Sequence, residues 1–433
     1  MKKKLLAVIL ALAVLVSACA CSSESPDLPS QDVPTQSLPA EATPEPTPEP
    51  TPEPTPEPQP IVAHLMAAGD IMTHLPITND AFVAASGEYD YTHMFADAAK
   101  QLAQADYAVA NLETPLAGGP NYSGYPNFNA PDSLAQNVKD AGFDLVSTAN
   151  NHTRDKGMNG VYRTLDVLDE VGLAHVGSYR SQEERDANTG IYVADVGGIS
   201  VAFLCYTYGL NGYTLPTDQR YAVNLINTDY LANPDRDLFI TDYLTNPGYD
   251  LLTADLEAAR ALDADLIAVL IHWGYEYWNN PNDYQKSLAR FLVEQGADLV
   301  LGNHPHVLEP YETVTVTGWD GEEREGFVSY SLGNFISNQY WETSVRTTAI
   351  LDLELTKTPD GETSLTAVTY TPYAMIHRDF ANPGDKRYLV NIHDAMAAYE
   401  AGDTSFITQS DYQNLQDSLK HCHNILGAEG DAG

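Results

Sequence analysis

The stretch Ala297 to Val307, ADLVLGNHPHV, guides the interpretation of the whole sequence. Leu299 to Leu301 is a short apolar run, typical of a buried strand, and Gly302 ends it. His304 and His306 follow with one residue between them. In an extended backbone, residues i and i+2 point to the same side, so both imidazoles are expected to face one point beyond the strand end. This pattern predicts a metal site.

Other apolar runs also end in side chains that can bind a metal. We predict strands at 61–68, 107–110, 143–148, 192–196, 199–206, 265–271, 327–330, 347–356 and 364–371. Between them we predict helices at 90–105, 131–141, 161–171, 252–262 and 284–295. Such alternation predicts a layered α/β fold, in which ligands bind at the carboxyl ends of the strands. The side chains expected there are Asp70, Glu113, Asn151, His152, His272, His304 and His306.

These side chains have the chemistry of a metal centre. Carboxylate, amide oxygen and imidazole are the mixed ligands of manganese, zinc and iron. A carboxylate can bridge two ions ~3.5–4 Å apart, and a bound ion lowers the pKa of its water to about 7. Taken singly, an Asp after a strand indicates a turn and a lone His a core position. Together they favour a site for one or two divalent ions, manganese, zinc or iron.

Six motifs carry a family resemblance: Gly69-Asp70, Asn111-Leu112-Glu113, Asn150-Asn151-His152, His272-Trp273-Gly274-Tyr275-Glu276, Gly302-Asn303-His304-Pro305-His306 and Ser331-Leu332-Gly333-Asn334-Phe335. From about residue 65 to 335 the chain resembles the CapA family, which is associated with bacterial poly-γ-glutamate capsule synthesis. That family is similar to the calcineurin-like metallophosphoesterases. The resemblance implies a four-layer α/β/β/α sandwich, which alternation alone does not predict.

The resemblance also implies roles for individual residues. Asp70 would bind the first metal, Glu113 would stand at the position of a bridging aspartate, and Asn151 would bind the second metal. His152 would be the acid that protonates the leaving group. The metal shell would be completed by His272, His304 and His306.

The sequence departs from the metallophosphoesterase patterns at two places, which leaves one metal position open. The phosphoesterase Asp-x-His pattern is Asp70-Ile71-Met72 here, and His74 comes two residues too late to replace the missing histidine without rearrangement. The Gly-Asp-x-x-Asp pattern becomes Asn-x-Glu at Asn111 to Glu113. Phosphoesterase activity therefore does not follow from the resemblance.

Further residues are expected to contact substrate or shape the cleft. Arg154 and Lys156 either attract an anionic substrate or form a solvated loop around Asp155. Glu276 is expected to orient His272 or to bind substrate. The other expected substrate-binding residues are Asn111, Asn150 and Asn334. The aromatic cluster Trp273, Tyr275, Tyr277 and Trp278 predicts a cleft wall or a core, and the long excursion at 208–250 is expected to shape specificity.

The first 60 residues predict export and anchoring. Residues 1–18 have the charged start, short apolar run and small residues of a signal peptide, and the run is shorter than the ~20 residues of a membrane span. Val16 to Cys19 resembles a lipobox, which predicts lipid on Cys19 and attachment to the outside of the bacterial cell membrane. Residues 19–60 are rich in Pro, Thr and Glu and predict a semi-rigid spacer. The CapA-like domain is expected at 61–375 and a peripheral helical region at 376–433.

The formal net charge of −38 argues against nucleic acid as a partner. The expected function is a surface-anchored CapA-type protein in synthesis, export or retention of an anionic capsule polymer, with a hydrolase-like metal site. Its partners would be the polymer or a phosphoester substrate, the membrane, and capsule synthase components. Two alternatives remain. One is a polymer-binding protein without turnover, favoured by Met72, and the other is an envelope phosphoesterase unrelated to capsule.

Overall fold

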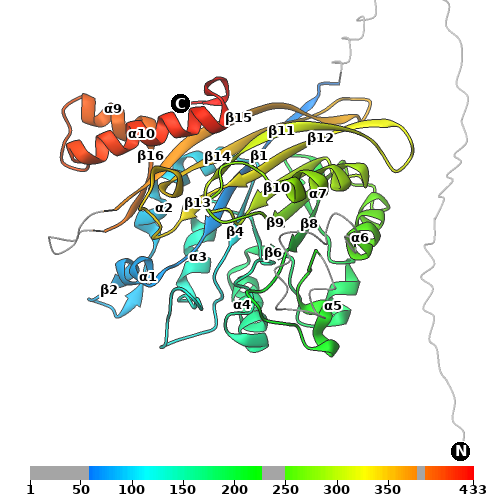
Figure 1. Ribbon diagram of the computed structural model, residues 1–433, viewed down its shortest axis with the longest axis horizontal. Coiled ribbons are helices and arrows are strands. Elements are labelled where there is room, and N and C mark those ends of the chain that lie inside the picture. Colours follow the sequence, from blue (N-terminus) through cyan, green and yellow to red (C-terminus); the bar gives the residue numbers. More distant parts are fainter. Residues whose placement is uncertain (1–57, 227–248, 378–385) are drawn as a thin grey trace, which may run out of the picture. The chain divides into compact units, whose positions relative to one another are not determined.

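Two β-sheets form the centre of the fold (Figure 1). In the first sheet the order is β16-β15-β14-β1-β4-β5-β6, with β13 paired to β1. Its strands are β1 Ile61–Ile71, β4 Tyr107–Leu112, β5 Leu145–Ser147, β6 Ala174–Val176, β13 Asn334–Ile336, β14 Thr347–Lys357, β15 Thr363–Ile376 and β16 Tyr388–Asn391. In the second sheet the order is β11-β12-β10-β9-β8-β7. Its strands are β7 Tyr192–Val196, β8 Ile199–Thr207, β9 Leu266–His272, β10 Leu299–Asn303, β11 Leu308–Thr317 and β12 Glu323–Leu332.

This computed structural model describes residues 58–226, 249–377 and 386–433. Glu57–Gly433 form one unit. The predicted signal peptide, Cys19 and nearly all of the spacer lie outside the described residues, as does 227–248 of the predicted specificity excursion. In the described part of the chain, no helix combines the length and the apolar character that crossing a membrane requires.

Helices cover the outer face of each sheet. Apolar residues of α2 Thr92–Leu102, α3 Ser133–Asp140 and α4 Gly157–Val171 pack on the first sheet. Those of α6 Asp250–Arg260 and α7 Asp283–Glu294 pack on the second. The long helix α10 Gln409–Leu426 lies near the C-terminus, after α9 Ile392–Glu400. The smaller elements are α1 Leu75–Ala81, β2 Phe82–Val83, β3 Glu88–Tyr89, α5 Gln182–Ala187, η1 Thr217–Ala222, α8 Thr343–Arg346 and η3 Ala428–Gly430. The expected four-layer α/β/β/α sandwich is confirmed.

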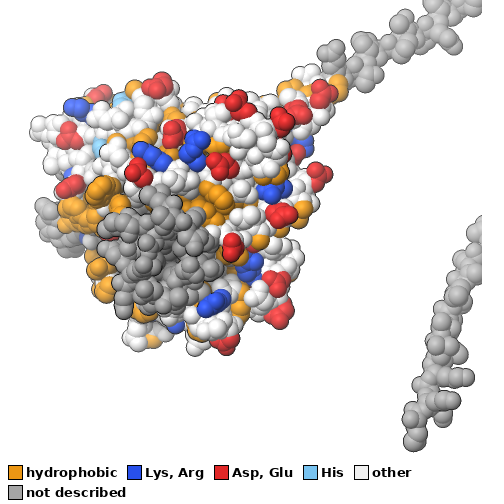
Figure 2. All heavy atoms as spheres, turned by 45° about the vertical axis from the view of Figure 1, so that its right-hand side comes forward, with side chains coloured by type: hydrophobic (Ala, Val, Ile, Leu, Met, Phe, Trp, Pro, Cys, Tyr) orange, Lys and Arg blue, Asp and Glu red, His pale blue; other side chains and the backbone are white. Residues whose placement is uncertain are grey.

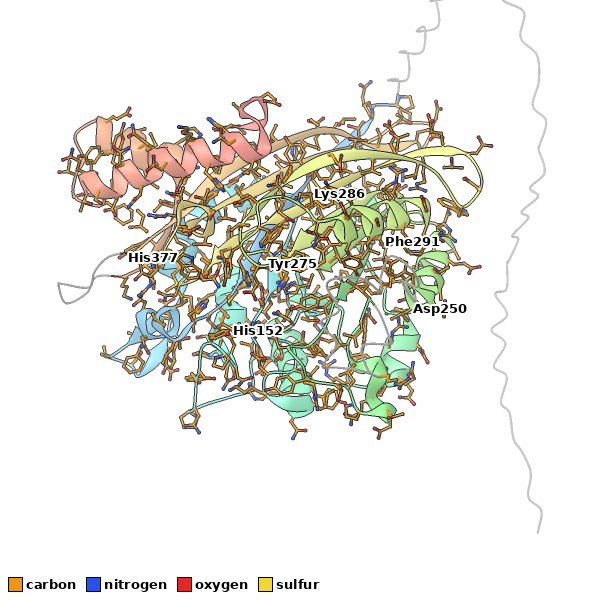
Figure 3. All side chains as sticks on the ribbon, in the orientation of Figure 1. His152, Asp250, Tyr275, Lys286, Phe291 and His377 are labelled. Atoms are coloured by element: carbon orange, nitrogen blue, oxygen red, sulfur yellow. The ribbon has the colours of Figure 1, made fainter. Side chains whose placement is uncertain are left out.

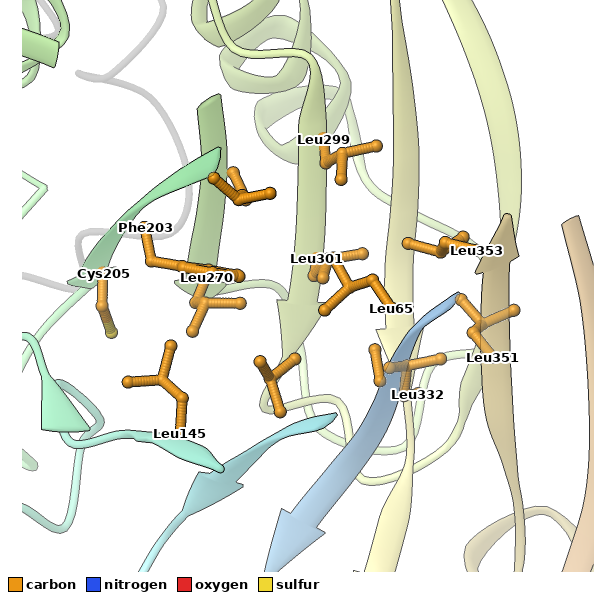
Figure 4. Packing of buried hydrophobic residues seen from close by; sticks show 14 of the residues in the cluster. Leu65, Leu145, Phe203, Cys205, Leu270, Leu299, Leu301, Leu332, Leu351 and Leu353 are labelled. Atoms are coloured by element: carbon orange, nitrogen blue, oxygen red, sulfur yellow. The ribbon is translucent and has the colours of Figure 1, made fainter. Parts of the chain in front are cut away.

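A core between the two sheets holds the sandwich together. Leu65 of β1 points into it, beside leucines of the second sheet such as Leu270 and Leu301 (Figure 4). The next residue, Met66, points the other way into the layer of α2, α3 and α4. Because successive side chains of a strand alternate between faces, and both faces are covered, these strands have continuous apolar sequences.

Several elements were not predicted. β6 is three residues long and carries no alternating pattern, and β16 is only four residues long. β11 lies at the edge of its sheet, where Glu-Pro-Tyr-Glu and the alternating Thr-Val-Thr-Val-Thr are compatible with one exposed face. By contrast, α4 ends as expected at Gly172, whose φ of 69° is the left-handed conformation that favours glycine.

We predict that Leu65→Ala lowers the free energy of unfolding by about 2–5 kcal/mol, because it leaves a cavity between the sheets. Val62→Ala on the same strand is the matched control. Val62 is 51% exposed, and its truncation should cost less than about 0.5 kcal/mol. Urea denaturation of both variants measures the difference, and equal losses would show that the intersheet core does not carry the stability.

Candidate metal centre

The predicted site residues lie where strands of both sheets end. β1, β4 and β5 are parallel in the first sheet, and β8, β9, β10 and β12 are parallel in the second. Their carboxyl ends meet at one edge of the sandwich, where Figure 3 labels His152 and Tyr275. Asp70 lies on β1, Glu113 follows β4, and His272 is the last residue of β9. The remaining positions follow β5 and β10: Asn151, His152, His304 and His306.

Gly69 lets β1 reach this edge. The Asp70 N–H donates to the Gly333 carbonyl at 2.9 Å, between β12 and β13. A Cβ on residue 69 would lie 1.9 Å from that carbonyl oxygen, so a larger residue would force the two segments apart. This close approach places the Asp70 carboxylate beside the loop that follows β10.

The backbone of that loop is not extended. The φ values of His304 and His306 are 100° and 59°, in the region that residues with side chains rarely adopt. The expectation of an extended His-Pro-His was therefore wrong, and β10 itself runs through Gly302 to Asn303. The two rings still face the same cluster, with centroids 5.7 Å apart. Backbone strain of this kind is often found at functional sites.

Carboxylates and imidazoles converge here within ligand distance of one another. Asp70 Oδ2 lies 3.0 Å from His306 Nδ1, and Glu113 Oε1 lies 3.5 Å from His272 Nε2 and 3.9 Å from His306 Nε2. Within the described residues, three sets of possible ligand atoms each lie within 4.8 Å of one another. These sets are Asp70 with Glu113 and His306, Glu113 with His272 and His304, and Glu276 with His304 and His306.

Glu113 is the residue that joins the first two sets. Burial first, and then the charge of Asp70, raise the pKa of Glu113 well above its ordinary value. The pKa of Asp70 is lowered. Burial raises it, but the hydrogen bond and charge of His306, the charge of His272 and the hydrogen bond of Asn111 together outweigh that effect. Two fully buried carboxyl groups side by side are unfavourable unless a cation or protons offset their charge.

The imidazoles are suited to bind that cation. Burial lowers the pKa of His272 to about 3, and burial together with His272 and His306 lowers the pKa of His304 well below its ordinary value. Both rings are therefore neutral at neutral pH, which is the form that binds metal.

Two atoms of the cluster have no hydrogen-bond partner among the described groups. They are Glu113 Oε1 and His304 Nδ1, both buried. Unpaired buried polar atoms are costly, and a metal ion would satisfy both. The donor set fits a divalent ion with mixed oxygen and nitrogen ligands.

Asparagines hold the ligands in place. Asn111 Nδ2 donates to Asp70 Oδ1 at 2.8 Å, and its Oδ1 accepts from Ser147 Oγ at 2.9 Å. Asn150 Nδ2 donates to the Leu112 carbonyl at 2.8 Å. Asn151 Oδ1 lies 3.0 Å from His272 Nε2, inside the cluster. Asn111 and Asn150 were expected to bind substrate, and the structure shows both buried in the network that positions the carboxylates.

His152 lies beside the cluster and has its own carboxylate. Its Nδ1 lies 2.7 Å from Asp155 Oδ2, and Asp155 also accepts the Phe128 N–H at 2.7 Å. Asp155 was predicted only as a charge between two cations of a loop, whereas it is buried behind His152. Its spacing of three residues from His152 was the signal that could have revealed this pair. Asn211 Nδ2, 3.3 Å from His152 Nδ1, was not predicted either.

The remaining predicted residues lie around the centre. Arg154 is partly exposed over the Tyr213 ring, with 5.6 Å from its guanidinium carbon to the ring centroid. Asn334 Nδ2 donates to the His306 carbonyl at 3.1 Å and so holds the strained loop. Glu276, expected to orient His272 or bind substrate, is exposed and belongs to a ligand set. Among the aromatic residues, Trp273 is core, whereas Tyr277 lies with its ring centroid 6.0 Å from that of His306.

Met72 and His74 are both near the centre. Met72 is buried, and its N–H donates to the Ile336 carbonyl at 2.8 Å. His74 packs edge-on against Phe128, with ring centroids 5.2 Å apart, and Phe128 packs edge-on against His152. Within the described residues, His74 belongs to none of the three ligand sets.

Most of the folded part of the chain, including all of these positions, matches one protein family. The family described as bacterial capsule synthesis protein PGA_cap matches residues 64–339. The chain belongs to this family.

Named relatives of this PGA_cap chain carry the same association. It is 32% identical over 267 residues to the "PGA biosynthesis protein CapA" of Bacillus subtilis, covering 61% of each chain. It is 28% identical over 272 residues to the "Capsule biosynthesis protein CapA" of Bacillus anthracis, covering 62% of this chain and 59% of the other. The chain thus spans about three fifths of the length of these relatives.

The matches to solved structures are more distant. The NAD nucleotidase of Haemophilus influenzae matches with a TM-score of 0.42 and 12% identity, over 87% of this chain and 65% of the other. The calcineurin-like phosphoesterase YfkN of Bacillus subtilis matches with a TM-score of 0.35 and 12% identity, over 84% of this chain and 97% of the other.

We predict that Glu113→Gln weakens metal binding at least about tenfold, because it removes the carboxylate that joins two ligand sets. Elemental analysis after dialysis against a known concentration of manganese or zinc measures the effect. Glu309→Gln is the matched control, since Glu309 is equally buried, follows the same loop, and belongs to no ligand set among the described residues. Equal metal content in wild type and Glu113→Gln would contradict the assignment.

Glu309 also gives a pH prediction. Its Oε2 accepts from Gln285 Nε2 at 2.6 Å, and burial raises its pKa to about 8 against an ordinary 4.5. Between these two values the Glu309 carboxyl is protonated in the folded protein and ionised in the unfolded chain. The stability that protonated Glu309 contributes is therefore full below pH 4.5 and is lost as pH rises through 8. Relative to Glu309→Gln, the wild type should lose roughly 2–5 kcal/mol between pH 4.5 and 8.5. Urea denaturation of both proteins across that range measures the difference, and parallel curves would contradict it.

Proposed function

We propose that this protein acts outside the cell membrane in synthesis, export or retention of an anionic capsule polymer such as poly-γ-glutamate, and that it has a metal-dependent, hydrolase-like centre. The observation that carries the proposal is the buried convergence of Asp70, Glu113, His272, His304 and His306 in a chain of the capsule synthesis family. The fold alone does not explain this cluster, because titratable side chains are rarely buried together for packing.

The residues of the centre would divide the chemistry between them. The five named side chains, with Asn151, would hold one or two divalent ions, manganese, zinc or iron. When bound, such an ion supplies Lewis acidity and activates water for attack on a phosphoester or amide. His152 would supply a proton to the leaving group. Asp155 holds its Nδ1, which leaves Nε2 as the atom for that transfer.

An anionic polymer can bind to this acidic protein only if cations make the local charge of the cleft positive. The net charge is −38, and Figure 2 shows acidic and basic side chains interspersed on one face of the folded part. Bound ions and Arg154, which forms no ion pair with a described carboxylate, would attract a polyanion against that background.

The proposed location follows from the first 60 residues. Lipid on Cys19 would attach the protein to the membrane, and the Pro-rich spacer to residue 60 could hold the domain on the order of 100 Å away. Capsule synthase components are the proposed protein partners at that surface.

A polymer-binding protein without turnover is the second candidate. Met72 favours it, because a thioether stands where the metallophosphoesterase pattern has a histidine. Such a protein would keep a metal or the fold, and hold polymer without cutting it.

We predict that the metal-loaded full chain hydrolyses a phosphodiester or a γ-glutamyl amide, and that His152→Asn lowers kcat about 10²-fold to 10⁴-fold without loss of metal. The assay is product release with a chromogenic phosphodiester and with oligo-γ-glutamate, alongside metal analysis. His175→Asn is the control, since His175 lies on β6, outside the centre, and pairs with Asp169 of α4. Absence of turnover in a metal-loaded wild type would overturn the hydrolase proposal in favour of the binding protein.

A further inference from the structure

A cavity of about 600 Å³ lies next to the metal centre. It opens between the end of β15, the segment around α8, and the first turns of α10. Its lining includes Tyr340, Trp341, Arg346, His377 and Ser410. His377 is labelled in Figure 3. None of these residues belongs to the three ligand sets of the metal centre.

One short segment joins the cavity to the metal centre. Asn334 donates to the His306 carbonyl at 3.1 Å and to Gln339 Oε1 at 2.9 Å. Gln339 Nε2 in turn donates to the Tyr277 hydroxyl at 3.1 Å. The Tyr277 ring lies between the two features, with its centroid 6.0 Å from that of His306 and 5.5 Å from that of Trp341. An extended ligand could therefore reach both.

Arg346 differs from the paired arginines of the fold. Carboxylates within the described residues neutralise Arg163, Arg180, Arg185, Arg324 and Arg387. Arg346 forms no such ion pair with a described residue. Among the described residues, its Nε donates to the Glu342 carbonyl, at 3.4 Å. A half-buried guanidinium that no described carboxylate neutralises is an available partner for an anionic ligand.

His377 is the second polar group of the cavity for which the described residues supply no hydrogen-bond partner. Both of its ring nitrogens are buried and make no hydrogen bond to a described residue. Its ring stacks on Tyr340, with centroids 4.2 Å apart and 17° between the planes. A neutral imidazole has one donor and one acceptor, so it could bond both to a carboxylate or carbonyl and to an amide N–H.

The cavity also has acidic neighbours. The Asp411 carboxylate is engaged at the start of its own helix, where it accepts from the Thr408 N–H and hydroxyl, each at 2.8 Å. Asp417 is exposed and interacts with Arg346 electrostatically without an ion pair.

Two aromatic side chains offer apolar contact beside Arg346. Tyr340 is 49% exposed and Trp341 is 58% exposed.

We propose that this cavity is a subsite that holds a carboxylate-bearing amide polymer while an adjoining part of the same chain lies at the metal centre. Arg346 pairs with a polymer carboxylate, His377 bonds to its amide backbone, and Tyr340 and Trp341 pack against its methylene groups. The subsite rests on the proposed function, because it takes the same anionic polymer as that centre.

Fluorescence anisotropy of a labelled oligo-γ-glutamate with the full chain tests the subsite. Arg346→Gln should raise Kd roughly tenfold, the size of a lost charge-assisted hydrogen bond. Ser410→Glu should do the same by placing a carboxylate at the cavity wall. Ser410 is exposed in the first turn of α10, where an acidic residue favours the helix, so this variant should fold.

Arg290→Gln is the matched control. Arg290 is exposed on α7, over the second sheet, and its loss changes the net charge by the same amount. Its Kd should stay within about twofold of the wild type. An oligo-γ-glutamine of equal length should bind at least roughly tenfold more weakly than the acidic oligomer.

The outcomes separate the subsite from the metal centre. Weaker binding by both cavity variants, with normal metal content, supports the subsite even if the protein shows no turnover. Binding that is abolished by chelation and unchanged in both variants overturns the subsite and leaves the metal centre standing. Equal affinity for the neutral oligomer, or no binding of the acidic oligomer by the wild type, also overturns it.

Discussion

The close approach of two buried carboxyl groups, Asp70 and Glu113, is the constraint on which this structure depends. They come from neighbouring strands, and both are fully buried among imidazoles. Two such groups lower the stability of a fold unless a cation or protons offset their charge. The glycine at residue 69, the left-handed backbone of the His-Pro-His loop, and the hydrogen bonds of Asn111 all serve to hold this arrangement. A bound divalent ion would offset both charges, and the donor set around them fits such an ion.

Part of this centre could be predicted from sequence because strand ends are visible in the sequence. An apolar run followed at once by Asp, Glu, Asn or His shows where a side chain leaves a strand, and parallel strands bring their ends together. The packing of two sheets against each other could not be predicted in this way. A strand that is covered on both faces is apolar whether its fold has one sheet or two, so only the family resemblance implied the sandwich.

What could not be predicted depends on backbone conformation and on contacts between distant segments. Nothing in Gly-Asn-His-Pro-His distinguishes an extended loop from one with positive φ at both histidines. The spacing of Asp155 from His152 indicates that the two can pair, but it does not show that Asp155 also accepts the Phe128 N–H from a distant loop. The cavity beside the centre joins Arg346, His377 and Ser410, which become neighbours only when α10 packs near the end of β15.

Diffraction from crystals grown with manganese, recorded at the manganese absorption edge, tests the central claim most directly. The account predicts an anomalous peak within about 2.5 Å of a Glu113 carboxylate oxygen and of a nitrogen of His272, His304 or His306. Crystals with well-ordered Glu113 and histidines but no anomalous density between them, or with manganese only at other sites, would contradict the account.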